Sequence, residues 1–261
     1  MPKPEIHDFK TELEGIIEKY QNPENDWKLI KAFRKRQIIN IETGDGFAVF
    51  LKSNDTVFVL GKNEKGQLGL GHNKDINMKP IKLTYFVKNK IKINVIKCGG
   101  LHCLAIDIMH KLYGWGYNYY GQCGISRDCK DINIDGCDIP DFNGENIPIC
   151  NKYFIDQGLK VMMIECGYYH SYVQCKDNDD GIISNYLFGS NEYNECLTFD
   201  DRKKIFEPWC IDNVLKERTF GDIRCINLGF ENTKIVIDNR DNVNNDNVCV
   251  VPDFHMTRYG L

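Results

Sequence analysis

Short apolar runs recur along the chain, and in four places a glycine turn joins two of them. The four segments read NIETGDGFAVFL (40–51), VIKCGGLHCLAI (95–106), MIECGYYHSYVQ (163–174) and CINLGFENTKIV (225–236). Each has an apolar strand, a glycine, and a second strand that begins three residues later. The glycines are Gly44, Gly99, Gly167 and Gly229, and the residues three positions on are Phe47, His102, His170 and Asn232. The pattern predicts four strand pairs of one design.

A second pattern follows each of the first three pairs. It reads VFVLGKNEKGQLG (57–69), LYGWGYNYYGQCG (112–124) and NYLFGSNEYNECL (185–197). The shared turn residues are Gly61, Asn63 and Gly66, then Gly116, Asn118 and Gly121, then Gly189 and Asn191. In the third copy Asn194-Glu195 replaces Gly-Gln. The replacement is mild, because asparagine is the next-best residue for a turn position with positive φ.

The spacing of the two patterns indicates one repeated unit. From Gly44 to Gly61 is 17 residues (61 − 44), and from Gly99 to Gly116 is also 17 (116 − 99). The first glycines are 55, 68 and 62 residues apart (99 − 44, 167 − 99, 229 − 167). Such a period, built from short strands and glycine turns, is typical of four-stranded propeller blades. We expect blades near 38–86, 91–154, 158–215 and 221–261.

The last strand of each blade is expected to follow a proline. In the first blade this strand is IKLTYF after Pro80, and Pro148 and Pro208 take comparable places in the next two. Proline suits the first residue of a strand, because no ladder donor is lost there. Residues 1–37 precede the blades and are predicted to be a helical extension, with helices over 4–20 and 26–33. Packing on the first blade is favoured over partner binding for these helices.

Composition bounds the class of protein and its partners. The chain has 261 residues, 42% of them hydrophobic, and no apolar run approaches the roughly 18 to 20 residues that span a membrane. The first ten residues lack the apolar segment of a signal peptide, so the expected location is intracellular, in the cytoplasm or the nucleus. The net charge of −4 argues against nucleic acid as the main partner.

The twelve cysteines are expected to be buried thiols, because no export signal is present. Cys98 and Cys166 match each other, directly before the strand-ending glycine, and are assigned to packing. The nearest arrangement to a metal cluster is Cys123, Cys129, Cys137 and Cys150. Its gaps are wide and irregular, unlike the paired spacings of structural zinc sites, so no metal site is predicted.

The glycine-rich stretch 61–71 raises the question of a phosphate site. A P-loop needs Gly-Lys followed by Ser or Thr, whereas Gln67 follows Gly66, and the dinucleotide motif lacks its third glycine. No cofactor is therefore predicted. His102 and His170 lie in different blades and are interpreted as turn-bracing residues. No nucleophile elbow or HExxH motif occurs, so an enzyme is not predicted.

These segments resemble the repeat of the regulator of chromosome condensation family, whose consensus runs V-x-x-G-x-x-H, then A-L, then V-Y-x-W-G-x-N-x-x-G-Q-L-G. Residues 95–124 match closely, the first blade has Phe47 where histidine is expected, and the fourth blade is faint. The resemblance covers about residues 38–251 and implies an all-β propeller. Members of the family typically close seven blades. About four are recognisable here, so the ring is expected to be smaller, open, or completed by a second molecule.

The leading hypothesis is a non-catalytic protein-interaction scaffold, because loops on a rigid disc are where partners bind. The segment 126–157 is the candidate contact loop, and its deletion is expected to spare folding. The resemblance implies one alternative, a guanine-nucleotide exchange factor for a Ran-like small GTPase. Another alternative is a degenerate structural subunit that associates through open propeller edges. The expected partner is thus another protein.

Overall fold

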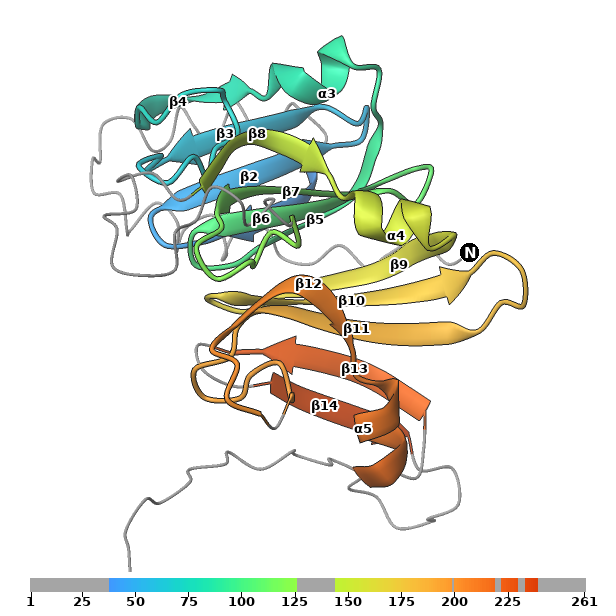
Figure 1. The fold of residues 1–261 in the computed structure, drawn as a ribbon. Helices are drawn as coiled ribbons and strands as arrows, with labels where there is room; N and C mark the ends of the chain where they lie inside the picture. The colour runs from blue at the N-terminus through green and yellow to red at the C-terminus, as the bar shows by residue number, and fades with distance from the viewer. Residues whose placement is uncertain (1–37, 126–143, 199, 219–221, 230–232, 239–261) are drawn as a thin grey trace, which may run out of the picture.

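The computed structural model describes residues 38–125, 144–198, 200–218, 222–229 and 233–238, which form four antiparallel sheets and three short helices. Figure 1 shows the sheets following one another in chain order. Within each sheet, every strand pairs with the next one in the sequence, so the strands follow one another as hairpins. No helix in the described part of the chain is long and apolar enough to cross a membrane.

The first three sheets have four strands each, and their bounds repeat at the predicted period. The first contains β1 (Ile38–Thr43), β2 (Phe47–Lys52), β3 (Val57–Gly61) and β4 (Ile76–Lys82). The second contains β5 (Ile93–Cys98), β6 (His102–Asp107), β7 (Leu112–Tyr117) and β8 (Gly144–Cys150). The third contains β9 (Leu159–Cys166), β10 (His170–Asp177), β11 (Ile183–Ser190) and β12 (Lys204–Cys210). The fourth pairs β13 (Asp222–Leu228) with β14 (Thr233–Asp238).

A chain of backbone hydrogen bonds joins the turns after the first strand of each sheet. The Asp45 N–H donates to the Gly100 carbonyl at 2.7 Å, Gly100 donates to Tyr168 at 3.1 Å, and Tyr168 donates to Gly229 at 3.0 Å. Successive first strands also contact one another. The same bond repeated from sheet to sheet means that the sheets are related by rotation about a common axis. The prediction of an all-β propeller is confirmed.

The strand-ending glycines are required by this close approach. A methyl group on Gly44 would collide with the Phe47 ring and with the Gly99 carbonyl of the next sheet. Gly99 has the same relation to His102 and to the Gly167 carbonyl. None of these three glycines has a positive φ, so the space between blades, and not the backbone conformation, selects glycine here.

The core lies between sheets. One cluster packs Val49, Val59 and Leu68 of the first blade against Ile96 and Trp115 of the second. A second cluster joins the second blade to the third through residues such as Leu104 and Phe188. Because both faces of each inner strand are covered, β2 and β6 are buried at nearly every position rather than at alternate ones.

The prediction for the last strand of the blade is wrong in its bounds. β4 begins at Ile76, before Pro80, and ends at Lys82; the next residues form the short helix α3 (Thr84–Lys88). Pro80, Pro148 and Pro208 are each the fifth residue of a seven-residue edge strand. An edge strand tolerates proline because one of its sides has no ladder partner.

Helices α3, α4 (Lys152–Asp156) and α5 (Asp212–Arg218) follow the edge strands of successive blades. The ring of Phe86 in α3 packs edge-on against Tyr113 and Trp115 of the second blade, with centroid distances of 5.7 and 5.8 Å. Phe154 in α4 contacts Tyr186 of the third blade in the same way, at 5.4 Å. Burial of one aromatic ring between blades explains why the connections at α3 and α4 turn helical.

The segment 126–157 is not one loop. Residues 144–150 form β8, and residues 152–156 form α4, so the prediction that deleting 126–157 spares folding is wrong. The rest of that segment, 126–143, lies outside the described residues. The predicted extension 1–37 and the last strand of the fourth blade also lie outside them.

Candidate protein-interaction face

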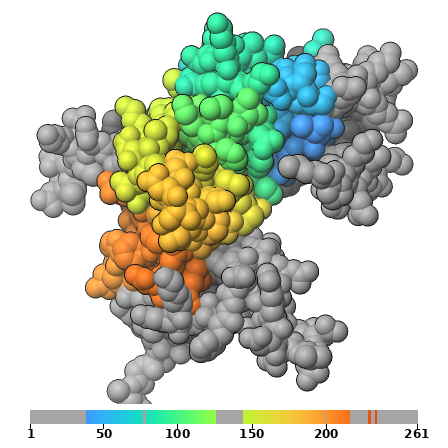
Figure 2. All heavy atoms as spheres, turned by 90° about the vertical axis from the view of Figure 1, so that its right-hand side faces the viewer, coloured from blue at the N-terminus to red at the C-terminus, as the bar shows by residue number. Residues whose placement is uncertain are grey.

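The loops after β3, β7 and β11 gather at one end of the blades, on the left in Figure 1, and the helices α3, α4 and α5 lie at the other end. Figure 2 looks onto the helix end, where the three blades follow one another from top to bottom in chain order. The loop end carries the turn residues singled out in the sequence. We call it the loop face.

An asparagine closes each loop of this face. Its Oδ1 accepts the backbone N–H of the residue five positions later, at 2.9 Å in all three blades: Leu68 to Asn63, Cys123 to Asn118 and Cys196 to Asn191. Its Nδ2 donates to oxygens farther along the loop, which include the carbonyls of His72, Ile125 and Arg202. All three asparagines are buried. They fix the loop backbone at the edge of the core.

The residue that follows the turn glycine gives each loop a second internal bond. Its side-chain oxygen accepts the backbone N–H two positions earlier: Lys65 to Gln67 at 2.9 Å, Tyr120 to Gln122 at 3.0 Å, and Tyr193 to Glu195 at 2.8 Å. Asn194 has φ 65° where Gly66 and Gly121 have 72° and 90°. The third loop therefore has the same backbone path as the others, with two residues replaced.

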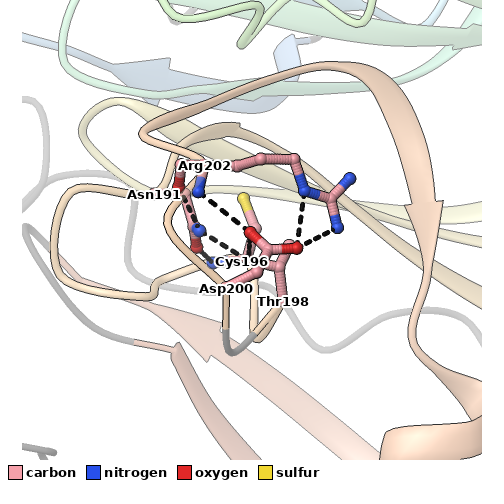
Figure 3. A network of polar contacts seen from close by, with 5 residues as sticks. All are labelled: Asn191, Cys196, Thr198, Asp200 and Arg202. Atoms are coloured by element: carbon pink, nitrogen blue, oxygen red, sulfur yellow. Dashed lines mark hydrogen bonds and ion pairs between the residues drawn. The ribbon is translucent and has the colours of Figure 1, made fainter.

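The third loop carries an additional ion pair, shown in Figure 3. Asn191 Nδ2 donates to Thr198 Oγ1 at 2.7 Å, and this hydroxyl donates to Asp200 at 3.0 Å. The Arg202 guanidinium lies 2.6 Å from Asp200 Oδ2 and stacks on the Trp209 ring at 4.6 Å. These contacts hold the Asp200 carboxyl at a pKa of about 2, mainly through the hydrogen bond from Arg202. The charge of Arg202 is thus already matched within the loop.

The loop 61–71 is not a phosphate cradle. The N–H of Gly66 donates to the Asn63 carbonyl at 3.0 Å, and the N–H of Gly69 donates to the Gly66 carbonyl at 2.9 Å. These donors close turns within the loop, so they do not converge on an external anion. Among the described residues, no group of three or more His, Cys, Asp or Glu side chains could hold a metal ion.

The two histidines contact neighbouring blades. His102 Nε2 lies 2.8 Å from Ser171 Oγ, and this hydroxyl donates to the Gln122 carbonyl at 2.8 Å. Since the single hydroxyl proton goes to the carbonyl, His102 is the donor to Ser171. His170 Nε2 has the same relation to Thr233, whose hydroxyl donates to the Glu195 carbonyl. In both cases the histidine of one blade ties the next blade to its own loop.

The first blade has an apolar version of this contact. Phe47 replaces the histidine, and Cys103 takes the place of the serine, with its thiol 3.6 Å from the Gln67 carbonyl. Burial lowers the pKa of His102 to about 3, with a smaller contribution from His170, so the ring is neutral. Burial also raises the pKa of the Cys98 and Cys166 thiols well above the usual value. Neutral imidazole and protonated thiols suit packing and bracing.

Five tyrosines form a continuous cluster on the loop face. Tyr117, Tyr119 and Tyr120 come from the second blade, and Tyr168 and Tyr169 come from the third. Neighbouring rings lie with centroids 4.5 to 6.2 Å apart, mostly edge to face. All five are half-buried. Sequence reasoning missed this cluster, although YNYY and GYYH stand at facing turns of adjacent blades.

Hydrogen bonds hold the tyrosine backbone in place. The Tyr117 N–H donates to the Leu101 carbonyl at 2.9 Å, and the Tyr169 carbonyl accepts from Ser190 at 2.8 Å. Tyr168 donates its hydroxyl to Asp45 of the first blade at 3.1 Å. Burial raises the pKa of Tyr117 and Tyr168 to about 12, so both hydroxyls keep their protons at neutral pH. The cluster is therefore a preorganised aromatic surface that spans blades.

Comparison with known proteins identifies the repeat. The family model "Regulator of chromosome condensation (RCC1) repeat" matches residues 54–106 and 110–174, and a second model of that repeat matches 93–122. The chain is 27% identical over 170 residues to the yeast guanine nucleotide exchange factor SRM1, covering 64% of this chain and 32% of that protein. It is 31% identical over 105 residues to the RCC2 homolog of Xenopus laevis, covering 40% and 20%.

Two solved structures share the fold. Human WBSCR16 superposes with a TM-score of 0.57 at 21% identity, covering 78% of this chain and 46% of that one. Yeast Prp20p gives 0.58 at 19%, covering 76% and 42%. The chain thus spans less than half the length of these relatives. Fold and turn network define a β-propeller protein. Residues 54–106 and 110–174 match the regulator of chromosome condensation repeat.

Proposed function

We propose that this protein is a non-catalytic interaction module and that its partner, another protein, binds the tyrosine cluster of the loop face. The observation that carries the proposal is the grouping of five half-buried tyrosines from two blades on one surface. Tyrosine is enriched among residues that dominate protein–protein binding, because its ring buries a large area at low conformational cost. An intracellular location is part of this proposal.

The rigidity of the loops supports the proposal. Asn118 and Gln122 fix the loop that carries Tyr119 and Tyr120. The backbone hydrogen bonds between successive blades fix Tyr168. A surface that is already ordered loses little entropy on binding, so more of the contact energy contributes to affinity.

The test compares affinity capture from native extract by the whole chain and by the variant Tyr119→Ala/Tyr169→Ala. The expected result is loss of the captured partner, with affinity for the purified partner at least about tenfold weaker. Tyr193→Ala is the matched control, since Tyr193 is 60% exposed and its ring contacts none of the five tyrosines in the described part of the chain. Unchanged capture by the double variant, with its melting temperature preserved, would refute the proposal.

The role of the segment after β7 stays a prediction. A deletion limited to 126–143 spares β8 and α4, unlike the deletion of 126–157. Loss of capture in this variant would assign the partner contact to that segment as well.

A second candidate is nucleotide exchange on a small GTPase, favoured by the similarity to a protein named as a guanine nucleotide exchange factor. The solved structure of Prp20p is described together with the binding of that protein to Gsp1p and histones. A nucleotide-release assay with a Ran-type GTPase separates the two functions. Release accelerated by this chain, and abolished by a loop-face variant, would favour exchange over simple binding.

The third candidate is a structural subunit that associates through sheet edges. Size-exclusion chromatography with mass measurement tests it directly. A stable self-assembled particle that persists on dilution would support this reading, because paired sheet edges bury backbone donors and acceptors over their whole length.

A further inference from the structure

Two lysine ammonium groups lie over rings of the tyrosine cluster. Lys204 Nζ is 3.3 Å from the centroid of the Tyr119 ring and 5.6 Å from that of Tyr120. Lys65 Nζ is 5.8 Å from the centroid of the Tyr117 ring. A cation is held over an aromatic face by the ring quadrupole, so these contacts position both charges beside the tyrosines.

Among the described residues, neither lysine has a carboxylate within ion-pair distance, whereas two other cations have one. Arg202 is paired with Asp200, and Lys97 lies between Glu42 and Glu165. The backbone around Lys65 and Lys204 is also fixed, by the Gln67 side chain in one case and by pairing with Ser190 in the other. The cluster therefore carries two positioned positive charges, and neither is paired with a carboxylate of the described residues.

Two acidic side chains lie beside rings of the cluster. The Asp45 carboxylate already accepts the Tyr168 hydroxyl at 3.1 Å. Glu192 is exposed next to Tyr120, whose pKa is raised by burial and by the charge of that glutamate. Tyrosine hydroxyls that keep their protons add donors to the two ammonium groups. The surface thus offers donors and cations around apolar rings.

From this surface, and on the basis of the proposed function, we propose that the partner binds with an acidic peptide segment. Its carboxylates pair with Lys65 and Lys204, and its apolar side chains lie on the tyrosine rings between them. Charge-assisted hydrogen bonds to carboxylates are stronger than neutral ones, and they fix the register of a segment on a flat surface.

Fluorescence polarisation with defined probes tests the chemistry. The probe is a short synthetic peptide that alternates glutamate and leucine. Comparison probes carry glutamine or lysine in place of glutamate, and a single-stranded oligodeoxynucleotide represents a nucleic-acid ligand. The acidic peptide is expected to bind tightest, and its affinity is expected to fall as salt rises from about 50 to about 300 mM, since screening weakens exposed pairs.

Charge variants assign the site. Lys65→Glu/Lys204→Glu is expected to weaken binding of the acidic peptide at least about tenfold, whereas Glu192→Lys strengthens it. Lys88→Glu is the matched control, since Lys88 is exposed in α3 at the opposite end of the blades. Lys65→Gln/Lys204→Gln gives a milder change that preserves side-chain size, and melting curves confirm that each variant is folded.

Several results would overturn the inference: equal binding of the glutamate and glutamine peptides, tighter binding of the lysine peptide or the oligonucleotide, or no binding of the acidic peptide. The two proposals fail separately. If the tyrosine variant loses its captured partner while the charge-reversed variant keeps it, docking on the tyrosines stands and the acidic segment does not. If both variants keep the partner, the proposed function fails as well.

Discussion

At the scale of single residues, the contacts between blades depend on a small set of positions. A histidine three residues after the strand-ending glycine donates to a hydroxyl of the next blade, as His102 does to Ser171. The first blade uses Phe47 and Cys103 at the same two positions. Apolar and polar pairs therefore fill the same space, and the polar pairs bring a dependence on pH.

The first prediction concerns His102→Phe. The folded-state pKa of His102 is lowered to about 3 from a usual value of 6.5. Its contribution to stability is therefore present above pH 6.5 and is lost as the pH falls toward 3. Urea unfolding should show that the whole chain loses about 2 kcal/mol from this group between about pH 7.5 and about pH 5, and that the variant does not. If the free energy of unfolding fell equally steeply with decreasing pH in both proteins, the prediction would be contradicted.

His72→Phe is the matched control for that experiment, because His72 is exposed. It is expected to leave the acid dependence of unfolding as it is in the unmodified chain.

The second prediction concerns Glu195→Gln. Burial raises the pKa of Glu195, in spite of hydrogen bonds that favour its charged form. A raised folded-state pKa means that stability present at low pH is lost as the pH rises through that value. Glutamine at this place keeps the bond from the Tyr193 N–H, as Gln67 and Gln122 keep theirs. Thermal unfolding at neutral pH should show a gain of about 1 kcal/mol.

The matched control is Glu192→Gln, since Glu192 is exposed in the same loop. It is expected to change stability by less than about 0.5 kcal/mol. A loss of stability in Glu195→Gln would mean that the bond from Ser190 needs a charged acceptor.

At the scale of elements, each blade depends on its edge strand and on the short helix that follows it. Phe86 and Phe154 are each 1% exposed, although their helices have only five residues. Helices this short are not stable alone. Burial of the phenylalanine ring against the adjacent blade therefore stabilises the helix. The helix in turn fills the space between the two blades.

Phe154→Ala tests this account. The substitution removes a ring that contacts Tyr186 of the next blade, and it should cost about 3 to 5 kcal/mol in urea unfolding. Ile155→Ala in the same helix is the matched control, because Ile155 is 43% exposed and should cost less than about 0.5 kcal/mol. Similar costs for the two variants would show that α4 stabilises the chain through helix formation and not through the ring.

At the scale of the whole molecule, rotation of the blades about the axis brings backbone groups of neighbouring blades into direct contact. The carbonyl of each strand-ending glycine lies close to the strand-ending glycine of the blade before it. Backbone cannot move aside as a flexible side chain does. A change at the axis therefore affects two blades at once.

Gly99→Ala is the test at this scale. The new methyl group would collide with the His102 ring and the Gly167 carbonyl, and it should destabilise the protein by about 3 kcal/mol in chemical unfolding. Gly71→Ala has only Ile147 near its methyl group, at 3.6 Å, but has a φ of +80°. Gly71→Ala is expected to lower the free energy of unfolding by about 1 kcal/mol, through local backbone strain. A larger loss at Gly71 than at Gly99 would contradict close packing at the axis.

The sequence by itself determined the repeated blade, its strand pairs and its turn residues, because these depend on neighbours within about 60 residues of one another. The periodic glycines and asparagines encode contacts inside one blade, such as Asn118 with Cys123. Local sequence also indicated that Asn194 could replace a glycine, and it has a φ of 65°.

Only the tertiary structure decided which residues meet between blades. His102 meets Ser171 across 69 positions, and Tyr117 meets Tyr169 from another blade. The short helices also escaped sequence reasoning, because α3 and α4 are each stabilised by an aromatic ring that packs on the neighbouring blade and not by their own helix propensity. The tyrosine surface exists because rotation about the axis places two unrelated loops side by side, and no pattern within one repeat specifies that rotation.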